Sequence, residues 1–244
     1  MNFDRSLDVA PGTLVPLSPL VSRLLAPNPG PFTFKGTGVH IIGAGRQVAV
    51  IDPGPALPGH IEALKQALGA RQVSHILVTH THRDHSSLAA RLKAATSAPI
   101  VGARPHAFAE ENSLFSGDHV MAWSTSVVAP PDGSMTDYMA SLDKLRGRNE
   151  TIYWPGHGGH VTDPERYLRA LTGHRRQREA SILARLDGGP LTIPEIVATV
   201  YAGIDPKLFG AAGLSTRAHL EDLMRRGMVT EEGGRYGKLL GGRS

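Results

Sequence analysis

The chain has 244 residues, of which 41% are hydrophobic and 20% charged, and it contains no cysteine. This composition is typical of a folded globular protein, and it restricts any metal site to histidine and carboxylate ligands. No run of about 18 apolar residues could span a bilayer, and the first 19 residues lack the basic start and apolar core of a secretory signal. We therefore expect a cytoplasmic protein without a membrane segment.

The first two thirds of the chain alternate between short apolar runs and segments with helical spacing of their apolar residues. This alternation predicts an α/β layered core. The elements expected here are, in order, strands over 39–42 and 47–51, a helix over 60–68, a strand over 75–79, a helix over 88–95, strands over 99–101, 114–116 and 151–154, and between the last two a helix over 134–145 that packs on the sheet.

The last third changes in character after residue 163, where a capping aspartate and a proline predict the start of a long helix over 164–186. A short helix over 193–201, a second helix capped by Ser215 and a hairpin around the sequence 229–236 follow. Two helices and a hairpin are typical of a winged-helix module. We therefore divide the chain into domains 1–163 and 164–244. All of the net charge of +4 falls in the second of these.

Four residues able to bind metal lie within six positions at the end of the predicted strand 75–79. His80 and His82 share one face of an extended segment and can bind one ion, while the following turn can direct Asp84 and His85 toward a second ion. Asp118 and His157 also follow predicted strands, so we expect a single site at one edge of one sheet. Imidazole and carboxylate ligands suit zinc, iron or manganese.

Other polar residues in this region have two interpretations. Asp52 either orients an imidazole or simply forms the turn at a strand end. His60, His75 and His174 are interpreted as surface or packing residues.

The segment Thr79-His80-Thr81-His82-Arg83-Asp84-His85 resembles the signature of the metallo-β-lactamase-fold hydrolases. Asn28-Pro29-Gly30-Pro31, the segment 50–54, Gly117-Asp118 and Pro155-Gly156-His157-Gly158 are similar to further motifs of that family. The resemblance extends over nearly the whole chain, and the C-terminal module resembles that of the lactamase-beta-2-like subgroup. It implies an αββα sandwich followed by a small winged-helix domain.

The same resemblance implies a dinuclear site with two divalent ions, zinc above all, with iron or manganese as alternatives. His80 and His82 would hold the first ion, whereas Asp84, His85 and His157 would hold the second. Asp118 would bridge both ions, and Asp84 would also orient the attacking hydroxide, which makes it the expected catalytic residue. Two such ions lower the pKa of a shared water from 15.7 toward about 7 and so favour hydrolysis.

One departure from the family concerns the first ion. The family supplies a third histidine from a Pro-Gly-His-Thr segment, and this chain has only residues 102–113 in its place, which we expect to be too short for the missing strand and turn. His106 is the only histidine there. Either His106 substitutes, or the first ion is held by an incomplete set of ligands.

Three functions remain open at this point. The first is hydrolysis of a small ester, thioester or lactam. The second is cleavage of single-stranded RNA, because the C-terminal module is basic. The third is a binding or regulatory protein that works through its winged helix, a module that also serves dimerisation and therefore allows a homodimer. The arginines that could contact phosphate are Arg175, Arg176, Arg178, Arg217, Arg225 and Arg226.

Overall fold

A computed structural model describes residues 3–239, which divide into two compact units. The sheet unit comprises residues 3–126 and 149–164, and the helical unit comprises residues 127–148 and 165–239. Within the described residues, no helix combines the length and apolar character needed to cross a bilayer.

The larger sheet of the sheet unit has six strands in sequence order, from β1 to β6. The pairs β1–β2, β2–β3 and β3–β4 are antiparallel, and the pairs β4–β5 and β5–β6 are parallel. The strands expected over 39–42 and 47–51 are present as β3 and β4, which pair antiparallel as a hairpin. The strands are β1 (Leu14–Pro16), β2 (Val21–Leu25), β3 (Gly38–Ile42), β4 (Gln47–Ile51), β5 (Gln72–Val78) and β6 (Ile100–Gly102).

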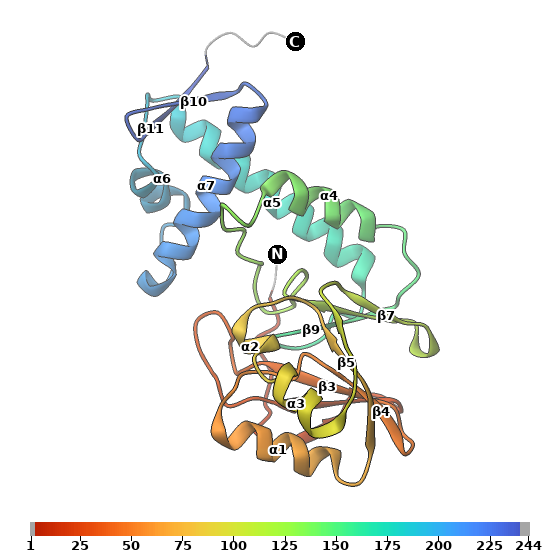
Figure 1. Ribbon diagram of the computed structural model, residues 1–244. Coiled ribbons are helices and arrows are strands. Elements are labelled where there is room, and N and C mark those ends of the chain that lie inside the picture. The colour runs from red at the N-terminus through yellow and green to blue at the C-terminus, as the bar shows by residue number, and fades with distance from the viewer. Residues whose placement is uncertain (1–2, 240–244) are drawn as a thin grey trace. The chain divides into compact units, whose positions relative to one another are not determined.

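Helices α1 (Pro58–Leu68) and α3 (Ala89–Thr96) cover one face of this sheet (Figure 1). Their apolar stripes, with Leu64 on α1 and Leu92 on α3, pack on strand residues such as Ile76 to form the main core. The parallel pairs require these crossover helices, because a parallel neighbour cannot be reached through a tight turn.

A second sheet in the order β7–β8–β9 faces the other side of the first. Val21 and Ile51 of the larger sheet pack against Phe115 and Trp154 of the smaller one, so the two sheets form a sandwich. Its elements are β7 (His106–Phe108), the 3-10 turn η1 (Ala109–Glu111), β8 (Ser113–Gly117) and β9 (Ile152–Pro155).

Two expectations about this region are wrong. The segment 102–113 does accommodate a strand, because β7 needs only three residues to pair antiparallel with β8. The strands that precede the metal-capable residues also belong to two sheets: β5 lies in the larger sheet, and β8 and β9 lie in the smaller one.

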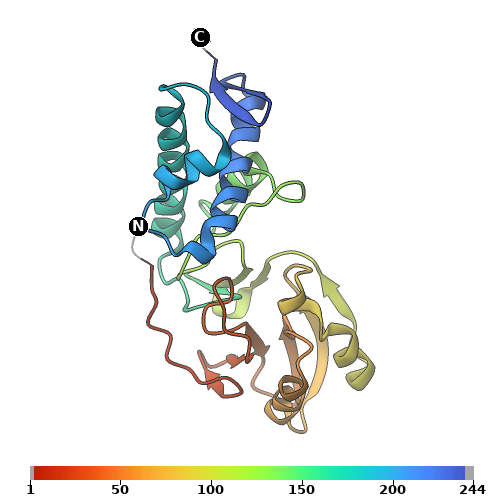
Figure 2. The same ribbon diagram turned by 90° about the vertical axis from the view of Figure 1, so that its left-hand side faces the viewer.

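The helical unit has a core of its own, formed by the second half of α5 with α6, α7 and the hairpin (Figure 2). Ile182, Ile196, Leu220 and Val229 are buried at its centre. Thr192 and Glu195 form a capping box that fixes the start of α6. The elements are α4 (Met135–Leu145), α5 (Pro164–Leu186), α6 (Ile193–Val200), η2 (Pro206–Leu208), α7 (Phe209–Arg225), β10 (Val229–Glu232) and β11 (Arg235–Lys238).

Within the helical unit, α4 packs on α7, and Arg225 of α7 donates to the hydroxyls of Ser134 and Thr136 at the start of α4. The expected packing of α4 on a sheet stays a prediction. One further expectation is corrected in this unit. Ser215 lies inside α7 and does not cap it. The helix starts earlier because Asp205 caps the preceding turn η2, which continues directly into α7.

Candidate metal centre

All six residues predicted to bind metal lie in one cluster of the sheet unit. His80 and His82 follow β5, Asp84 and His85 lie on the single-turn helix α2 (Arg83–Ser86), and Asp118 and His157 follow β8 and β9. Potential ligand atoms fall into three groups, in each of which all atoms lie within 4.8 Å of one another. These groups are His80, His82 and Asp118; Asp84, His85 and His157; and Asp52, His80 and His85.

The buried side of the cluster holds four ligand atoms that face one another. The Nε2 atoms of His85 and His157 are 3.2 Å apart. Asp84 Oδ2 lies 3.4 Å from His85 Nε2 and 3.1 Å from His157 Nε2. Asp118 Oδ1 lies 3.5 Å from each of the same two nitrogens.

These separations fit a tetrahedral metal ion. Zinc binds imidazole nitrogen at about 2.0–2.1 Å, which places two ligand atoms of a tetrahedron about 3.3 Å apart. The five separations in this group run from 3.1 to 3.5 Å. Asp118 Oδ1 is buried, and its contacts with the two imidazole nitrogens at 3.5 Å are too long for well-formed hydrogen bonds, so this oxygen stays available to a cation. The residues present therefore fit a divalent ion.

The outer side of the cluster has fewer ligands. His80 Nε2 lies 3.1 Å from His82 Nδ1 and 3.6 Å from Asp118 Oδ2. Asp118 thus presents one oxygen to each side, which is the geometry of a bridging carboxylate. The groups of potential ligands among the described residues do not include His106, whose Nε2 lies 3.2 Å from the carbonyl oxygen of Val78.

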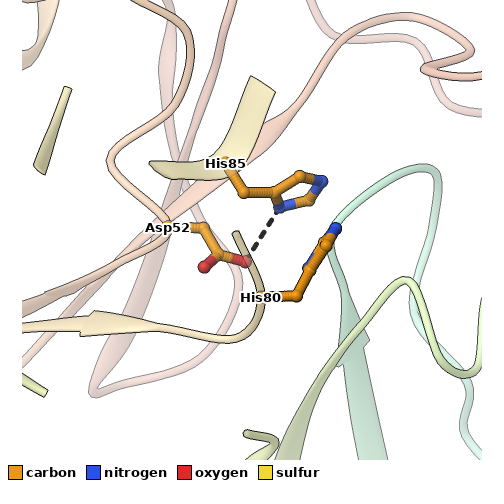
Figure 3. A group of neighbouring side chains, drawn as sticks. All are labelled: Asp52, His80 and His85. Carbon is orange, nitrogen blue, oxygen red and sulfur yellow. Dashed lines mark hydrogen bonds and ion pairs between the residues drawn. The ribbon is translucent and has the colours of Figure 1, made fainter. Parts of the chain in front are cut away.

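Asp52 fixes the orientation of histidines on both sides of the cluster (Figure 3). Its Oδ2 accepts from His85 Nδ1 at 3.0 Å and from the Thr79 hydroxyl at 2.6 Å. Because the Thr79 hydroxyl donates to Asp52, its oxygen can accept from His80 Nδ1, which is 3.0 Å away. Both imidazoles therefore keep the lone pair of Nε2 for a metal ion. Asp52 also has a turn-forming φ of 49°, so both of its interpretations apply.

The backbone orients His157 in a similar way. Its Nδ1 lies 3.2 Å from the carbonyl oxygen of Gly36, which can only accept, so Nδ1 carries the proton and Nε2 faces the cluster. The hydroxyl oxygen of Thr37, the residue after Gly36, lies 3.5 Å from Asp84 Oδ2. The side chain of Asn28 holds Thr37 in place, since it accepts from the Thr37 amide and donates to the Thr37 hydroxyl, both at 2.9 Å.

The concentration of carboxylates attracts positive charge to this cluster. Burial lowers the pKa of His157, but hydrogen bonds with Asp118 and Asp84 outweigh it and raise the pKa to about 9. Burial likewise opposes protonation of His85, whereas Asp118, Asp52 and Asp84 raise its pKa to about 12. Burial raises the pKa of Asp118, yet bonds with His157, His80 and His85 hold it well below its usual value. A divalent cation would satisfy the same carboxylates.

Two glycines allow the elements of the cluster to approach closely. A Cβ on Gly156 would lie 2.4 Å from His85 Cε1 and 2.9 Å from Asp118 Oδ1. Gly117 has a φ of 53°, and a Cβ there would lie 2.5 Å from Thr79 Oγ1. Any side chain at either position would displace the groups that face the metal site.

His60 is a site residue that the sequence interpretation missed. It is fully buried on α1, and its Nε2 donates to the carbonyl oxygen of Pro53 at 3.0 Å. The next residue, Gly54, donates its amide to the carbonyl oxygen of His85. His60 therefore holds the loop that carries Asp52. His60 lies one turn before Leu64 and two turns before Leu68 on the buried face of α1, a spacing that indicates burial but not the hydrogen-bond partner.

Two protein-family profiles match parts of this chain. The metallo-beta-lactamase superfamily profile matches residues 36–113, which include the four ligand candidates after β5. The profile of the beta-lactamase associated winged helix domain matches residues 192–238.

Similar proteins extend over most of the chain. An atrochrysone carboxyl ACP thioesterase from Cryptosporiopsis sp. is 26% identical over 95% of this chain and 88% of its own. A beta-lactamase-like protein 2 homolog from Caenorhabditis elegans is 27% identical over 93% of this chain and 92% of its own. The alignment with the thioesterase has 290 positions. This chain contributes about 232 residues to it, which is 95% of 244, so about 58 alignment positions have no residue of this chain.

The fold is shared with solved structures. A metallo-beta-lactamase family protein from Thermus thermophilus superimposes with a TM-score of 0.72 at 21% identity, covering 92% of this chain and all of the other. The expected α/β class and the C-terminal winged helix are thereby confirmed.

Proposed function

Because the chain carries a metallo-beta-lactamase superfamily domain followed by a beta-lactamase-associated winged helix domain, we propose that it is a metal-dependent hydrolase of small thioesters or esters. The observation that carries this proposal is the pair of ligand groups that share Asp118, one oxygen directed to each. A site that binds two cations through a shared carboxylate is suited to activating water beside a polarised carbonyl.

In this proposal His85, His157, Asp84 and Asp118 hold the inner ion. His80 and His82 hold the outer ion together with Asp118, and this set remains one ligand short of the inner one. The two ions, zinc above all, supply Lewis acidity and a water of lowered pKa.

The side chains of the cluster differ in their exposure, and this difference indicates their roles. His85 and His157 are 0% and 1% exposed, so their positions are fixed by the fold. Asp84 is 25% exposed and His82 is exposed, so substrate reaches the cluster from their side. Asp84 uses one oxygen toward the histidines and can accept a hydrogen bond from the attacking water with the other. Such positioning is what a hydrolytic carboxylate contributes.

The thioester class is supported by a relative, since a protein that covers nearly the whole chain is described as an ACP thioesterase. The thiolate is a good leaving group, so a thioester does not require the strong general acid that an amide requires. The side chains of this cluster that point to the open side are carboxylates and imidazoles, which is sufficient for such a substrate.

Three of the six arginines expected to contact phosphate are engaged with acidic side chains or with a ring. Arg226 pairs with Glu179 at 2.6 Å and with Asp222 at 2.9 Å, and Arg217 pairs with Glu221 at 2.8 Å. Arg175 is buried over the ring of Tyr138. Neighbouring acids and rings compete with phosphate for these charges, which favours a small substrate over RNA.

A thiol-release assay tests the proposal. The purified protein, loaded with zinc or manganese, is offered a butyryl thioester of N-acetylcysteamine, and the released thiol is detected with a chromogenic disulfide. We expect release that stops on chelation, resumes on metal addition, and falls at least a hundredfold in Asp84→Ala. The exposed variant Asp143→Ala serves as the control.

A parallel assay with single-stranded RNA decides between the two substrate classes. Thioester hydrolysis should change little between about 50 and 200 mM salt, whereas RNA binding through several arginines should weaken by orders of magnitude. RNA cleavage without thiol release would contradict the proposal, and so would thiol release that is indifferent to chelation.

A further inference from the structure

Arg23 is a buried charged residue of the sheet unit that the proposed reaction does not use. It lies on β2 two positions after Val21, which packs against the smaller sheet. Side chains two apart on a strand share a face, so Arg23 also points into the space between the two sheets. The residue is 6% exposed. Because a guanidinium group keeps its proton at neutral pH, β2 places a positive charge inside the sandwich.

The surroundings of Arg23 do not compensate this charge. Burial lowers the pKa of Arg23, and no carboxylate among the described residues raises it. His40 lies opposite on β3, and burial, followed by the charge of Arg23, lowers the pKa of His40 to about 3, so that it stays neutral. The Nε atom of Arg23 is buried and has no hydrogen-bond partner among the described residues. An apolar side chain is often as stable in such a position, so stability alone does not account for Arg23.

Arg23 contacts the main chain beside the metal centre. Its Nη1 donates to the carbonyl oxygen of Gly158 at 2.9 Å. Gly158 directly follows His157, which is one of the residues predicted to bind metal. Gly38 leaves room for this contact, because a Cβ at Gly38 would lie 3.1 Å from Arg23 Cδ. The buried charge is therefore joined to the segment that carries His157.

This segment has little rigidity of its own. His157 is preceded by Gly156 and followed by Gly158, whose φ is 81°. Glycine adopts more backbone conformations than other residues, so contacts from other segments must fix the direction of the His157 ring. Before His157, the carbonyl of Gly156 accepts from the amide of Gly38 at 2.8 Å. After His157, the carbonyl of Gly158 accepts from Arg23.

We propose that Arg23 is a positioning residue of the metal centre, which directs His157 at the inner ion by holding the carbonyl of Gly158. The effect passes through the main chain of the segment 156–158. This inference rests on the proposed function, because it requires the inner ion. The charge of Arg23 by itself acts in the opposite direction, since a buried cation repels a metal ion. Removing Arg23 should therefore weaken metal binding if the hydrogen bond decides, and strengthen it if the charge decides.

Two neutral variants remove the contact with Gly158. Arg23→Met keeps an apolar stem, and the amide of Arg23→Gln ends where Arg23 Nε lies, so neither side chain reaches the carbonyl. Arg23→Gln decides if Arg23→Met does not fold. Arg175→Met is the matched control, because Arg175 is 3% exposed and belongs to the helical unit.

The substitutions are made in His82→Ala, which weakens the outer set of ligands so that the inner ion is titrated alone. Zinc affinity is measured by competition with a chromophoric chelator, and the d–d absorption of bound cobalt reports the coordination geometry. Urea denaturation of the metal-free protein measures stability separately. We expect zinc affinity to fall about tenfold in both Arg23 variants, with an altered cobalt spectrum. Arg175→Met should leave affinity and spectrum unchanged, even where it lowers stability.

Unchanged or higher zinc affinity in the Arg23 variants would overturn the proposal, even if these variants were less stable. An equal loss of affinity in Arg175→Met would overturn it as well, because the loss would then reflect stability in general. The unsubstituted protein separates this inference from the proposed function. If that protein binds no zinc, both are contradicted, whereas tight zinc binding that is indifferent to Arg23 contradicts the positioning role alone.

Discussion

Replacing Asp52 by asparagine tests how the metal centre is built. The carboxylate accepts from the Thr79 amide at 2.7 Å, from the Thr79 hydroxyl at 2.6 Å and from His85 Nδ1 at 3.0 Å. In Asp52→Asn the amide oxygen can keep the contact with the Thr79 amide, and the NH₂ group then faces His85 Nδ1. Two donors cannot share that contact, so His85 must move its proton to Nε2 and lose the lone pair that faces the metal.

The size of the effect follows from these contacts. One hydrogen bond to a buried charged group contributes about 1.5–3 kcal/mol, so we expect a loss of this order in the free energy of unfolding. Loss of a partner that orients a ligating histidine costs about 10–100-fold in metal affinity, which is about 1.4–2.8 kcal/mol. The Thr79 hydroxyl, which donates to Asp52, also contacts His80 Nδ1. Metal binding should therefore weaken on both sides of the cluster.

Zinc affinity is measured by competition with a chromophoric chelator, alongside urea denaturation of the metal-free protein. Asp143→Asn is the matched control, since Asp143 is exposed and makes a single ion pair of 3.8 Å with Arg146. Unchanged zinc affinity in Asp52→Asn would refute the claim that Asp52 orients His85 and His80 for metal binding, even if the variant were less stable.

Substitutions at His60, Gly156 and His219 probe the surroundings of the site and the helical unit. His60→Leu should cost about 1–3 kcal/mol in the free energy of unfolding and weaken zinc binding, and His60→Gln should restore part of both, because its amide can donate to Pro53. Gly156→Ala should lower zinc affinity at least tenfold, whereas Gly45→Ala, with open space around its Cβ, should leave it unchanged. Burial, followed by the charge of Arg175, lowers the pKa of His219 to about 3. The unfolded chain binds this proton below about pH 6.5, so stability falls by about 1.4 kcal/mol per unit from there toward pH 3, and urea denaturation of His219→Gln should show a shallower loss.

The metal-capable residues could be found from sequence because they follow strands. An apolar strand that ends in a run of histidines and aspartates limits where those side chains can go, and the structure brings His80, His82, Asp84 and His85 together as that pattern suggests. The pattern could not show that Asp118 and His157 come from a second sheet, since two facing sheets and one continuous sheet produce the same alternation of strands and helices.

Contacts made by single buried polar groups were harder to foresee. The role of His60 depends on one bond to the carbonyl oxygen of Pro53, and backbone carbonyls leave no trace in a sequence. The start of α7 was misplaced because Ser215 is a good cap in isolation, while Asp205 ten residues earlier already caps a turn that runs into the helix. Tertiary packing decides between such local alternatives.

Anomalous scattering from a zinc-soaked crystal tests the central claim most directly. Two peaks are expected, a strong one surrounded by Asp84, His85, His157 and one oxygen of Asp118, and a weaker one beside His80. A map with the side chains in place but no peak among them, after soaking at millimolar zinc, would contradict the account.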